Sequence, residues 1–209
     1  MNKRLKAFSV SDGRWHLWKD AAGSPFVNMA VDEILCKDSC ISEGGVPLLR
    51  IYGWDRPSVS FGYAQKYPAD IAGKYTLVRR PTGGGIVYHL NDVTYTFIVP
   101  AKHEIMRLDR IESYMFFHIP ILKLLRNSGV AAELAPSNEI SEDRETMACF
   151  RNAARHDVVA AGSKIAGAAQ RRSRSGILHQ GSILLDNLPG IRKDLLIDSL
   201  ICGFAEEYK

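Results

Sequence analysis

The stretch from Pro47 to Val99 contains five strand candidates in quick succession: PLLRIYGW (47–54), PSVSFGY (57–63), YTLVRR (75–80), GIVYH (85–89) and VTYTFIV (93–99). Gly, Pro and Asp signals separate each candidate from the next. Further along lie HDVVAA (156–161), a Gly162-Ser163 turn into KIAGAAQRR (164–172), and GILHQGSILLD (176–186). This run of strands predicts a sheet built mainly from antiparallel neighbours.

Helical signals stand apart from this run of strands. After a short strand candidate, WHLWKD (15–20), we expect a helix with Asn28 as its N-cap. A second helix should begin at Asp109, which forms a capping-box pair with Glu112, and stop at Gly129. The last, within 189–208, has a proline near its start. Because helices and strands do not alternate one by one, the fold class is α+β, a mainly antiparallel sheet flanked by helices.

Composition bounds the kinds of protein that this chain can be. Its 209 residues are 46% apolar and 24% charged, which is typical of one folded domain, and we treat 1–209 as a single domain. A net charge of +4 is too small and too mixed to indicate a nucleic-acid partner. The N-terminus lacks the apolar core of a signal peptide, and no later stretch is apolar enough to cross a bilayer. These features predict a cytoplasmic protein that does not bind membranes.

Four cysteines show no CxxC pair and no spacing typical of zinc, so we expect no metal site. Cys36, Cys40 and Cys202 lie in apolar helical patterns and are expected to pack in the core. Cys149, in MACF (147–150), reads most simply as a small buried hydrophobe, and becomes a nucleophile only in a cationic setting. The run from Arg151 to Arg174 has a net charge of +5, which fits either a solvated face or a docking surface for an acidic partner.

Two short segments are candidates for ligand binding. RRPTGGGIVYH (79–89) joins two strand candidates through three glycines, so that backbone N–H groups could approach a ligand closely while two arginines hold a carboxylate or phosphate. The same pattern fits a tight hairpin with surface arginines. Lys164 begins KIAGAAQ (164–170), where small neighbours would let a ligand press against the strand, although an exposed strand lysine is the simpler interpretation.

In combination these segments resemble the biotin/lipoate A/B protein ligase family over most of the chain. The segments that carry the resemblance are NMAVDE (28–33), SVSFGYAQ (58–65), RRPTGGGIVYH (79–89), KIAG (164–167) and HQGSILL (179–185), in the family's order. The resemblance implies a class II biotin/lipoyl synthetase-like catalytic domain that delivers an octanoyl or lipoyl group to a lysine of a carrier domain. The expected acceptor is a lipoyl domain or glycine cleavage H protein.

Within this family the chain is most similar to cysteine-dependent octanoyltransferases, whose nucleophile lies in an A-C-F tripeptide upstream of the K-I/V-A-G lysine. Ala148-Cys149-Phe150 stands in that position, fifteen residues before Lys164. The resemblance implies that Cys149 takes the acyl group from acyl carrier protein as a thioester without a cofactor. It makes Cys149 and Lys164 the catalytic residues, with a substrate pocket formed by Arg79, Arg80, Gly83, Gly84, Gly85, His89, Gly167, Ala168 and His179.

Other readings stay open at this point. Gly85 and Leu90 stand where those transferases often carry Arg and Asp, Gly85 being the ligase-like residue, and the C-terminal part is shorter than usual for them. A ligase would use ATP and Mg²⁺ to form lipoyl-AMP, with Cys149 incidental, although we expect 1–209 to carry no accessory C-terminal domain of the kind that many ligases have. A non-catalytic acyl- or carrier-binding paralogue and a biotin transferase are further alternatives.

Overall fold

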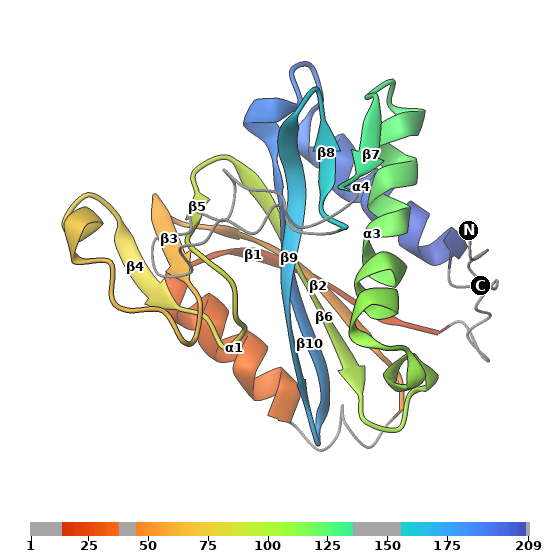
Figure 1. The fold of residues 1–209 in the computed structure, drawn as a ribbon, viewed down its shortest axis with the longest axis horizontal. Coiled ribbons are helices and arrows are strands. Elements are labelled where there is room, and N and C mark those ends of the chain that lie inside the picture. The colour runs from red at the N-terminus through yellow and green to blue at the C-terminus, as the bar shows by residue number, and fades with distance from the viewer. Residues whose placement is uncertain (1–13, 38–44, 136–155, 208–209) are drawn as a thin grey trace.

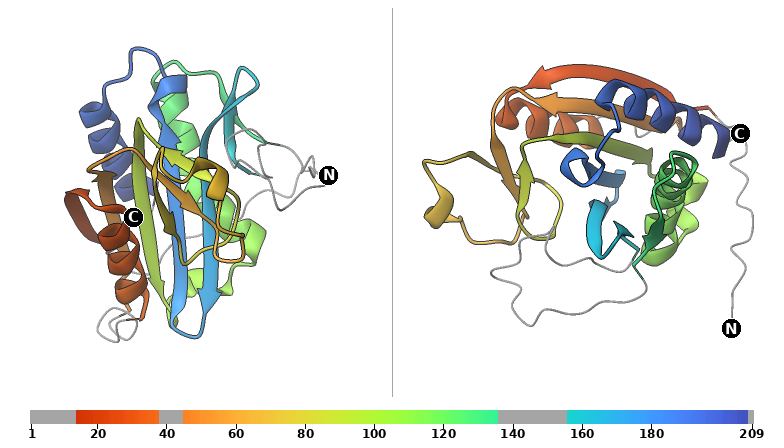
Figure 2. Two further views of the ribbon diagram at one scale, coloured as in Figure 1. Left: turned by 90° about the vertical axis from the view of Figure 1, so that its left-hand side faces the viewer. Right: turned by 90° about the horizontal axis from the view of Figure 1, so that it is seen from above.

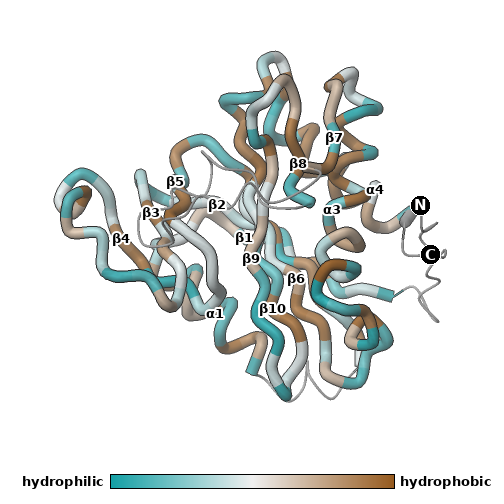
Figure 3. The backbone as a smooth tube through the Cα atoms, in the orientation of Figure 1, coloured by the Kyte–Doolittle hydropathy of each residue, from teal (hydrophilic) through white to brown (hydrophobic). Residues whose placement is uncertain are grey.

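The computed structural model describes residues 14–37, 45–135 and 156–207. At its centre is β6 (Asp92–Pro100), every residue of which is buried, and the hydropathy colouring of Figure 3 shows hydrophobic residues along it. β2 (Leu48–Trp54) and β10 (Gly176–Leu184) pair with β6 on either side, both antiparallel. A strand buried along its whole length needs cover on both faces, and the rest of the described chain supplies that cover.

Seven described strands form the large sheet, in the order β1-β2-β6-β10-β9-β8-β7. All its pairs are antiparallel except β1 with β2. The remaining strands of this sheet are β1 (His16–Gly23), β7 (Ala132–Leu134), β8 (Val158–Ala160) and β9 (Ser163–Ser173). A small sheet in the order β4-β3-β5 contains β3 (Ser58–Phe61), β4 (Thr76–Arg79) and β5 (Val87–His89). The expected mainly antiparallel α+β fold is therefore confirmed.

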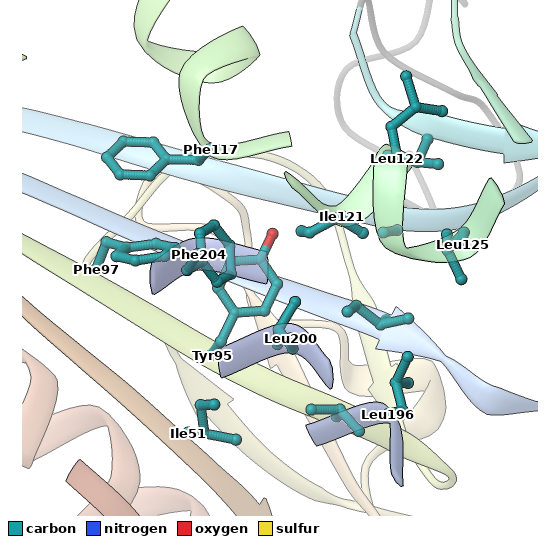
Figure 4. Close-up of a cluster of buried hydrophobic side chains, with 14 of the residues drawn as sticks. Ile51, Tyr95, Phe97, Phe117, Ile121, Leu122, Leu125, Leu196, Leu200 and Phe204 are labelled. Carbon is teal, nitrogen blue, oxygen red and sulfur yellow. The ribbon is translucent and has the colours of Figure 1, made fainter. Parts of the chain in front are cut away.

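Three α-helices cover the two faces of the large sheet. The buried core on one face joins inward residues of the sheet to α3 (Arg110–Asn127) and α4 (Lys193–Glu207), and Figure 4 shows its aromatic centre, where Phe97 lies between Phe117 and Phe204. On the other face, α1 (Pro25–Lys37) contacts β6, β10 and β4. Figure 1 shows the small sheet at the left and α3 at the right of the large sheet, and the view from above in Figure 2 agrees.

Short 3-10 turns complete the described chain, at Ala69–Ile71, Glu104–Arg107 and Leu185–Asn187. The capping box of α3 is present, since Glu112 N donates to Asp109 Oδ1 at 2.8 Å and Asp109 N donates to Glu112 Oε2 at 3.0 Å. Gly129 has φ +82° just after the helix, as a C-terminal stop requires. The Gly162-Ser163 turn and all the strands expected from the sequence are also confirmed, whereas β7 was not anticipated.

Three local predictions were wrong. Asn28 is inside α1 rather than at its cap, because the helix begins at Pro25 and the Ser24 hydroxyl accepts from Val27 N at 3.3 Å. The last helix begins at Lys193, four residues after Pro189. Cys202 is exposed on α4 instead of packed in the core. Cys36 is buried as expected, and burial raises the pKa of its thiol. Cys40 lies outside the described residues.

Candidate active site

A cavity lies on the α1 face of the large sheet, against the small sheet. Small and apolar groups supply much of its wall: Met29 from α1, Val87 from β5 and the β9 segment Gly167-Ala168-Ala169. The polar groups on the wall are engaged with one another or with neighbouring groups. The other lining residues are Tyr52, Trp54, Ser60, Arg80, Gly84, His89, Thr94, Lys164, Gln180, Gly181 and Ser182.

The glycine turn between β4 and β5 forms one side of the cavity. Gly84 has φ +84°, a left-handed conformation that favours glycine, and lies on the wall. Its carbonyl oxygen would be 2.0 Å from a Cβ at Gly62, so the turn packs directly on the end of β3. The Arg80 guanidinium holds the turn from inside by donating to the carbonyl oxygens of Gly83 and Gly85 at 2.5 and 2.7 Å.

Lys164 enters the cavity from β9. Its Nζ is 2.7 Å from the Asp157 Oδ2 atom, and the two side chains are 6% and 2% exposed. The side chain lies directly over Gly167: a Cβ there would be 2.2 Å from Lys164 Cε and 2.5 Å from Nζ. Glycine at 167 is therefore what allows the ammonium group to lie flat against the sheet.

A buried hydrogen-bond network ties α1 to the glycine turn. The Asp32 carboxylate, fully buried, accepts from Arg50 Nη1 at 2.7 Å, Thr96 Oγ1 at 2.7 Å and Gln180 Nε2 at 2.8 Å. The Gln180 Oε1 atom in turn accepts from Thr82 Oγ1 at 2.7 Å. Gln180 therefore links the carboxylate on α1 to the residue just before the three glycines.

The Tyr52 hydroxyl is part of the same network and donates to Asp32 Oδ2 at 2.9 Å. Burial, with the negative charge of Asp32 beside it, raises the pKa of Tyr52 well above its usual value. The hydroxyl therefore stays protonated and remains a donor. The Arg50 guanidinium balances the charge of this carboxylate and also meets Asp20 at 2.6 Å.

A second network surrounds His89. Its Nδ1 atom is 2.8 Å from Asp92 Oδ2 and its Nε2 atom is 2.8 Å from Ser60 Oγ. The ring stacks on Trp54, with ring centroids 3.9 Å apart and an angle of 18° between the planes. His89 lines the cavity and is only 5% exposed, so the surrounding side chains fix the position of its ring.

Three comparisons with known proteins agree on the kind of domain. Residues 24–199 match the model of the lipoyl protein ligase A/B catalytic domain, which is most of the chain. The chain belongs to the lipoyl protein ligase A/B family. The octanoyltransferase LipM of Kyrpidia tusciae is 39% identical over 183 residues, covering 82% of this chain and 66% of the relative. LipM of Bacillus subtilis is 36% identical over 184 residues, with the same coverage of both chains.

Structural neighbours share the lipoyl protein ligase A/B fold. A crystal structure of lipoate-protein ligase A bound with ATP is 22% identical with a TM-score of 0.73, and the match covers 93% of this chain and 85% of that one. A bipartite lipoate protein ligase of Thermoplasma acidophilum, described with its E2 lipoyl domain, is 21% identical with a TM-score of 0.61 over 93% and 83% of the two chains. At these identities the likeness concerns the fold alone. The chain spans about two thirds of the length of the LipM relatives named above.

The structure brings six of the expected site residues together on the wall of one cavity: Arg80, Gly84, His89, Lys164, Gly167 and Ala168. Gly83 and Gly85 belong to the same turn and meet Arg80 through their carbonyl oxygens. The expected nucleophile, Cys149, lies outside the described residues.

Arg79 and His179 are not among the residues that line the cavity. The Arg79 guanidinium donates to the carbonyl oxygens of Tyr63 and Gln65, so it holds the loop after β3. His179 is fully buried on the opposite face of the large sheet, in the aromatic core, with its ring centroid 4.3 Å from that of Phe117. Burial lowers the pKa of His179 well below its usual value, so the ring is neutral.

Sequence reasoning missed several residues that organise the site, above all Asp32, Gln180, Asp157 and Ser60. A signal for Asp32 was available, because it lies three residues after Met29 and four before Cys36, which is the spacing of one buried helical face, and Asn28 lies on the same face of α1. Two polar residues on such a stripe indicate a buried polar network. Nothing comparable singles out Ser60, which depends on the pairing of distant strands.

The described residues set two further bounds. None of the helices within 14–37, 45–135 and 156–207 combines the length and apolar character that a membrane span needs. The same ranges hold no group of three or more His, Cys, Asp or Glu side chains arranged to bind a metal ion.

Proposed function

We propose that this chain transfers an octanoyl or lipoyl group from acyl carrier protein, through a thioester on Cys149, to a lysine of a lipoyl-carrier domain such as glycine cleavage H protein. The observation that carries the proposal is the position of Lys164, an ammonium group fixed by Asp157 on the wall of a cavity rich in small and apolar groups. The naming of relatives at 36–39% identity as octanoyltransferases supports the same reaction.

The cavity suits a medium-length acyl chain. Met29, Val87 and the small residues of β9 offer apolar contact. The polar side chains on the wall already have hydrogen-bond partners within the protein, so an apolar ligand leaves them satisfied. An alkyl chain that leaves water for such a wall gains about 0.8 kcal/mol per buried methylene group. Chain length rather than polar recognition would then set the affinity.

In the proposed reaction the Cys149 thiolate attacks the thioester carbonyl of the donor. A new C–S bond forms, the C–S bond to the carrier breaks, and the carrier leaves as a thiol after taking up a proton. The acceptor amine then attacks the acyl-enzyme, forms an amide, loses a proton and releases the Cys149 thiolate. Lys164 would stabilise the oxyanion of both tetrahedral intermediates. The energy of the donor thioester drives the sequence, so neither ATP nor a metal ion takes part.

The test is intact-mass spectrometry after incubation with octanoyl acyl carrier protein. We expect wild type to gain the mass of one octanoyl group, and Cys149→Ala to gain none. Cys202→Ser, which removes an exposed thiol on α4, should behave as wild type and is the matched control. An unmodified wild type that releases pyrophosphate with lipoate and ATP would replace the transferase by a ligase, and a chain inert in both assays would be a binding paralogue.

A further inference from the structure

Ser60, His89 and Asp92 form a linear set of hydrogen bonds at the wall of the acyl cavity. Ser60 Oγ is 2.8 Å from His89 Nε2, and His89 Nδ1 is 2.8 Å from Asp92 Oδ2. Ser60 and His89 both line the cavity. Serine, imidazole and carboxylate in this order are the parts of a nucleophilic hydrolase, which is recognised by geometry rather than by sequence position.

The surroundings of Asp92 decide which nitrogen of His89 carries the proton. Asp92 Oδ2 also accepts from Ser182 Oγ at 2.5 Å and from Thr94 Oγ1 at 2.9 Å. Burial raises the pKa of the Asp92 carboxyl, but hydrogen bonds from His89, Ser182 and Thr94 outweigh it and leave the pKa below its usual value. The group is therefore a carboxylate that only accepts. His89 Nδ1 is then the donor to Asp92, and in the neutral ring Nε2 accepts the Ser60 hydroxyl proton.

Neighbouring groups fix this arrangement. Trp54 stacks on the imidazole and donates from Nε1 to Thr94 Oγ1 at 2.8 Å, so the ring cannot rotate away. Arg80 Nη1 is 3.3 Å from Ser60 Oγ, which places a positive charge beside the oxygen that would become an alkoxide. Ser58, two residues earlier on β3 and equally buried, instead donates to the Arg56 carbonyl at 2.7 Å and makes no such relay.

We propose that Ser60 is a second nucleophile of this cavity, activated by His89 and Asp92, and that the protein hydrolyses medium-chain acyl thioesters and activated acyl esters independently of Cys149. This activity shares the acyl cavity of the proposed function but not its cysteine. Lys164 and Arg80 line the same space and are the cations available to a developing oxyanion.

The reaction balances in two steps. Ser60 Oγ bonds to the carbonyl carbon and gives its proton to His89 Nε2, the bond to the leaving thiol or alcohol breaks, and His89 returns the proton to that leaving group. Water then attacks the seryl ester with His89 again as base, giving the free fatty acid and restoring Ser60. His89 also borders a second hollow together with Arg56, Leu90 and Lys193, and the proposal brings the water from that side.

The test uses the full chain carrying Cys149→Ala, so that the cysteine cannot contribute, with p-nitrophenyl octanoate as substrate. We expect nitrophenolate release well above that of the heat-unfolded protein, and a fall of roughly 100-fold when Ser60→Ala is added. Ser58→Ala in the same background should leave the rate unchanged. Thermal unfolding of each variant establishes that it is folded. Hydrolysis that is absent in the Cys149→Ala protein, or that survives Ser60→Ala, overturns the proposal.

A covalent readout separates the two proposals further. A fluorophosphonate should label the Cys149→Ala protein, and peptide mapping should place the label on Ser60, whereas a label elsewhere or none would count against the serine. If wild type carries octanoyl on Cys149 but shows no Ser60-dependent hydrolysis, the hydrolase proposal is wrong and the transferase proposal stands. If Ser60-dependent hydrolysis occurs and no octanoyl is found on Cys149, the transferase proposal is wrong and the hydrolase proposal stands.

Discussion

Lys164 Nζ lies 2.7 Å from the Asp157 carboxylate, and the two side chains are 6% and 2% exposed. A buried pair of this kind holds its charges in place because separating them weakens the compensation of two charges in a medium of low polarity. Gly167 lies directly under the lysine side chain. The position of the ammonium group is therefore set from two sides, by a carboxylate and by the absence of a Cβ.

Replacing Gly167 by alanine should displace the lysine without unfolding the protein. The new Cβ would be 2.2 Å from Lys164 Cε, a contact that the flexible end of the side chain can escape only by leaving its place. We expect Gly167→Ala to lower acyl transfer by about 100-fold, and to lower the free energy of unfolding by at most about 3–5 kcal/mol because the displaced ammonium group weakens its buried pair with Asp157. Steady-state transfer of octanoyl to a lipoyl domain, measured with the unfolding curve, checks this.

Gly203→Ala is the matched control for that variant. Gly203 is inside α4, and the nearest atom to a Cβ there is the Pro120 carbonyl oxygen at 3.9 Å. Alanine at such a helical position should raise stability by about 0.5–1 kcal/mol and leave transfer unchanged. Normal transfer by Gly167→Ala would show that the place of Lys164 over residue 167 is unimportant for the reaction.

Asp32 should be the most sensitive position of the polar network for stability. Its carboxylate meets the buried guanidinium of Arg50 and accepts from side chains of β6 and β10. Asp32→Ala would remove the buried carboxylate that pairs with this cation, and we expect a loss of about 3–5 kcal/mol in the free energy of unfolding. Chemical denaturation measures it. Glu33→Ala, which breaks only an exposed pair with Lys37, should cost at most about 1 kcal/mol. If Asp32→Ala and Glu33→Ala lowered the free energy of unfolding equally, the buried network around Asp32 would not be important for stability.

The difference between these adjacent residues illustrates what the sequence can reveal. The strand segments, the capping box of Asp109 and the glycine turn have local causes, so short patterns predicted them correctly. The link from Asp32 through Gln180 to Thr82 spans α1, β10 and the turn, and it depends on the pairing of β6 with β10 that brings Thr96 opposite Gln180. No pattern within a few residues encodes such a contact.

The wrong predictions for Asn28 and Cys202 also arise from contacts between residues that are distant in the sequence. Asn28 has the chemistry of an N-cap, yet its side chain donates to the Gly53 carbonyl at 2.9 Å, a contact that exists only when β2 lies beside α1. Cys202 follows an apolar helical pattern, but α4 turns that side of the helix to the outside. At both positions the sequence correctly predicted a helix nearby. Tertiary packing determined which contacts Asn28 makes and whether Cys202 is buried.

His179 should make the stability of the protein depend on pH. Its pKa in the folded state is lowered, first by burial and then by the neighbouring His118, while an unfolded histidine titrates near 6.5. As the pH falls below 6.5, His179 binds a proton in the unfolded chain but stays neutral in the folded chain. The free energy of unfolding therefore decreases by up to about 1.4 kcal/mol per pH unit for this group. Burial shifts the pKa of His118 in the same direction.

We therefore expect His179→Phe to reduce the slope of unfolding free energy against pH between pH 5 and about 6.5, leaving the contribution of His118. Above about pH 7, where histidine is neutral in both states, the two proteins should run parallel, and this range is the internal control. Phenylalanine also removes a buried Nε2 atom that has no hydrogen-bond partner in the described structure. Urea titrations at several pH values measure the slope, and an unchanged slope would mean that His179 takes up protons in the folded state.

Arg171 is the described residue best placed to steer an acidic donor. It is exposed on β9, its Nη1 atom is 3.5 Å from the Pro81 carbonyl beside the glycine turn, and its guanidinium lies 5.7 Å from the centre of the Tyr63 ring. Its neighbour Arg172 instead donates to the Met106 carbonyl at 2.8 Å and so holds the segment before α3. The described part of the basic run is thus divided between structural and exposed cations.

Because acyl carrier proteins are acidic, Arg171→Glu should slow encounter with the donor rather than the chemistry that follows. We expect kcat/KM for octanoyl acyl carrier protein to fall by roughly tenfold at low salt and the deficit to shrink as salt is raised. An uncharged octanoyl thioester should react equally with both proteins. Lys123→Glu, on the helix that covers the opposite face of the large sheet, is the control for charge alone. A parallel loss with both donors would place Arg171 in the chemistry instead of the encounter.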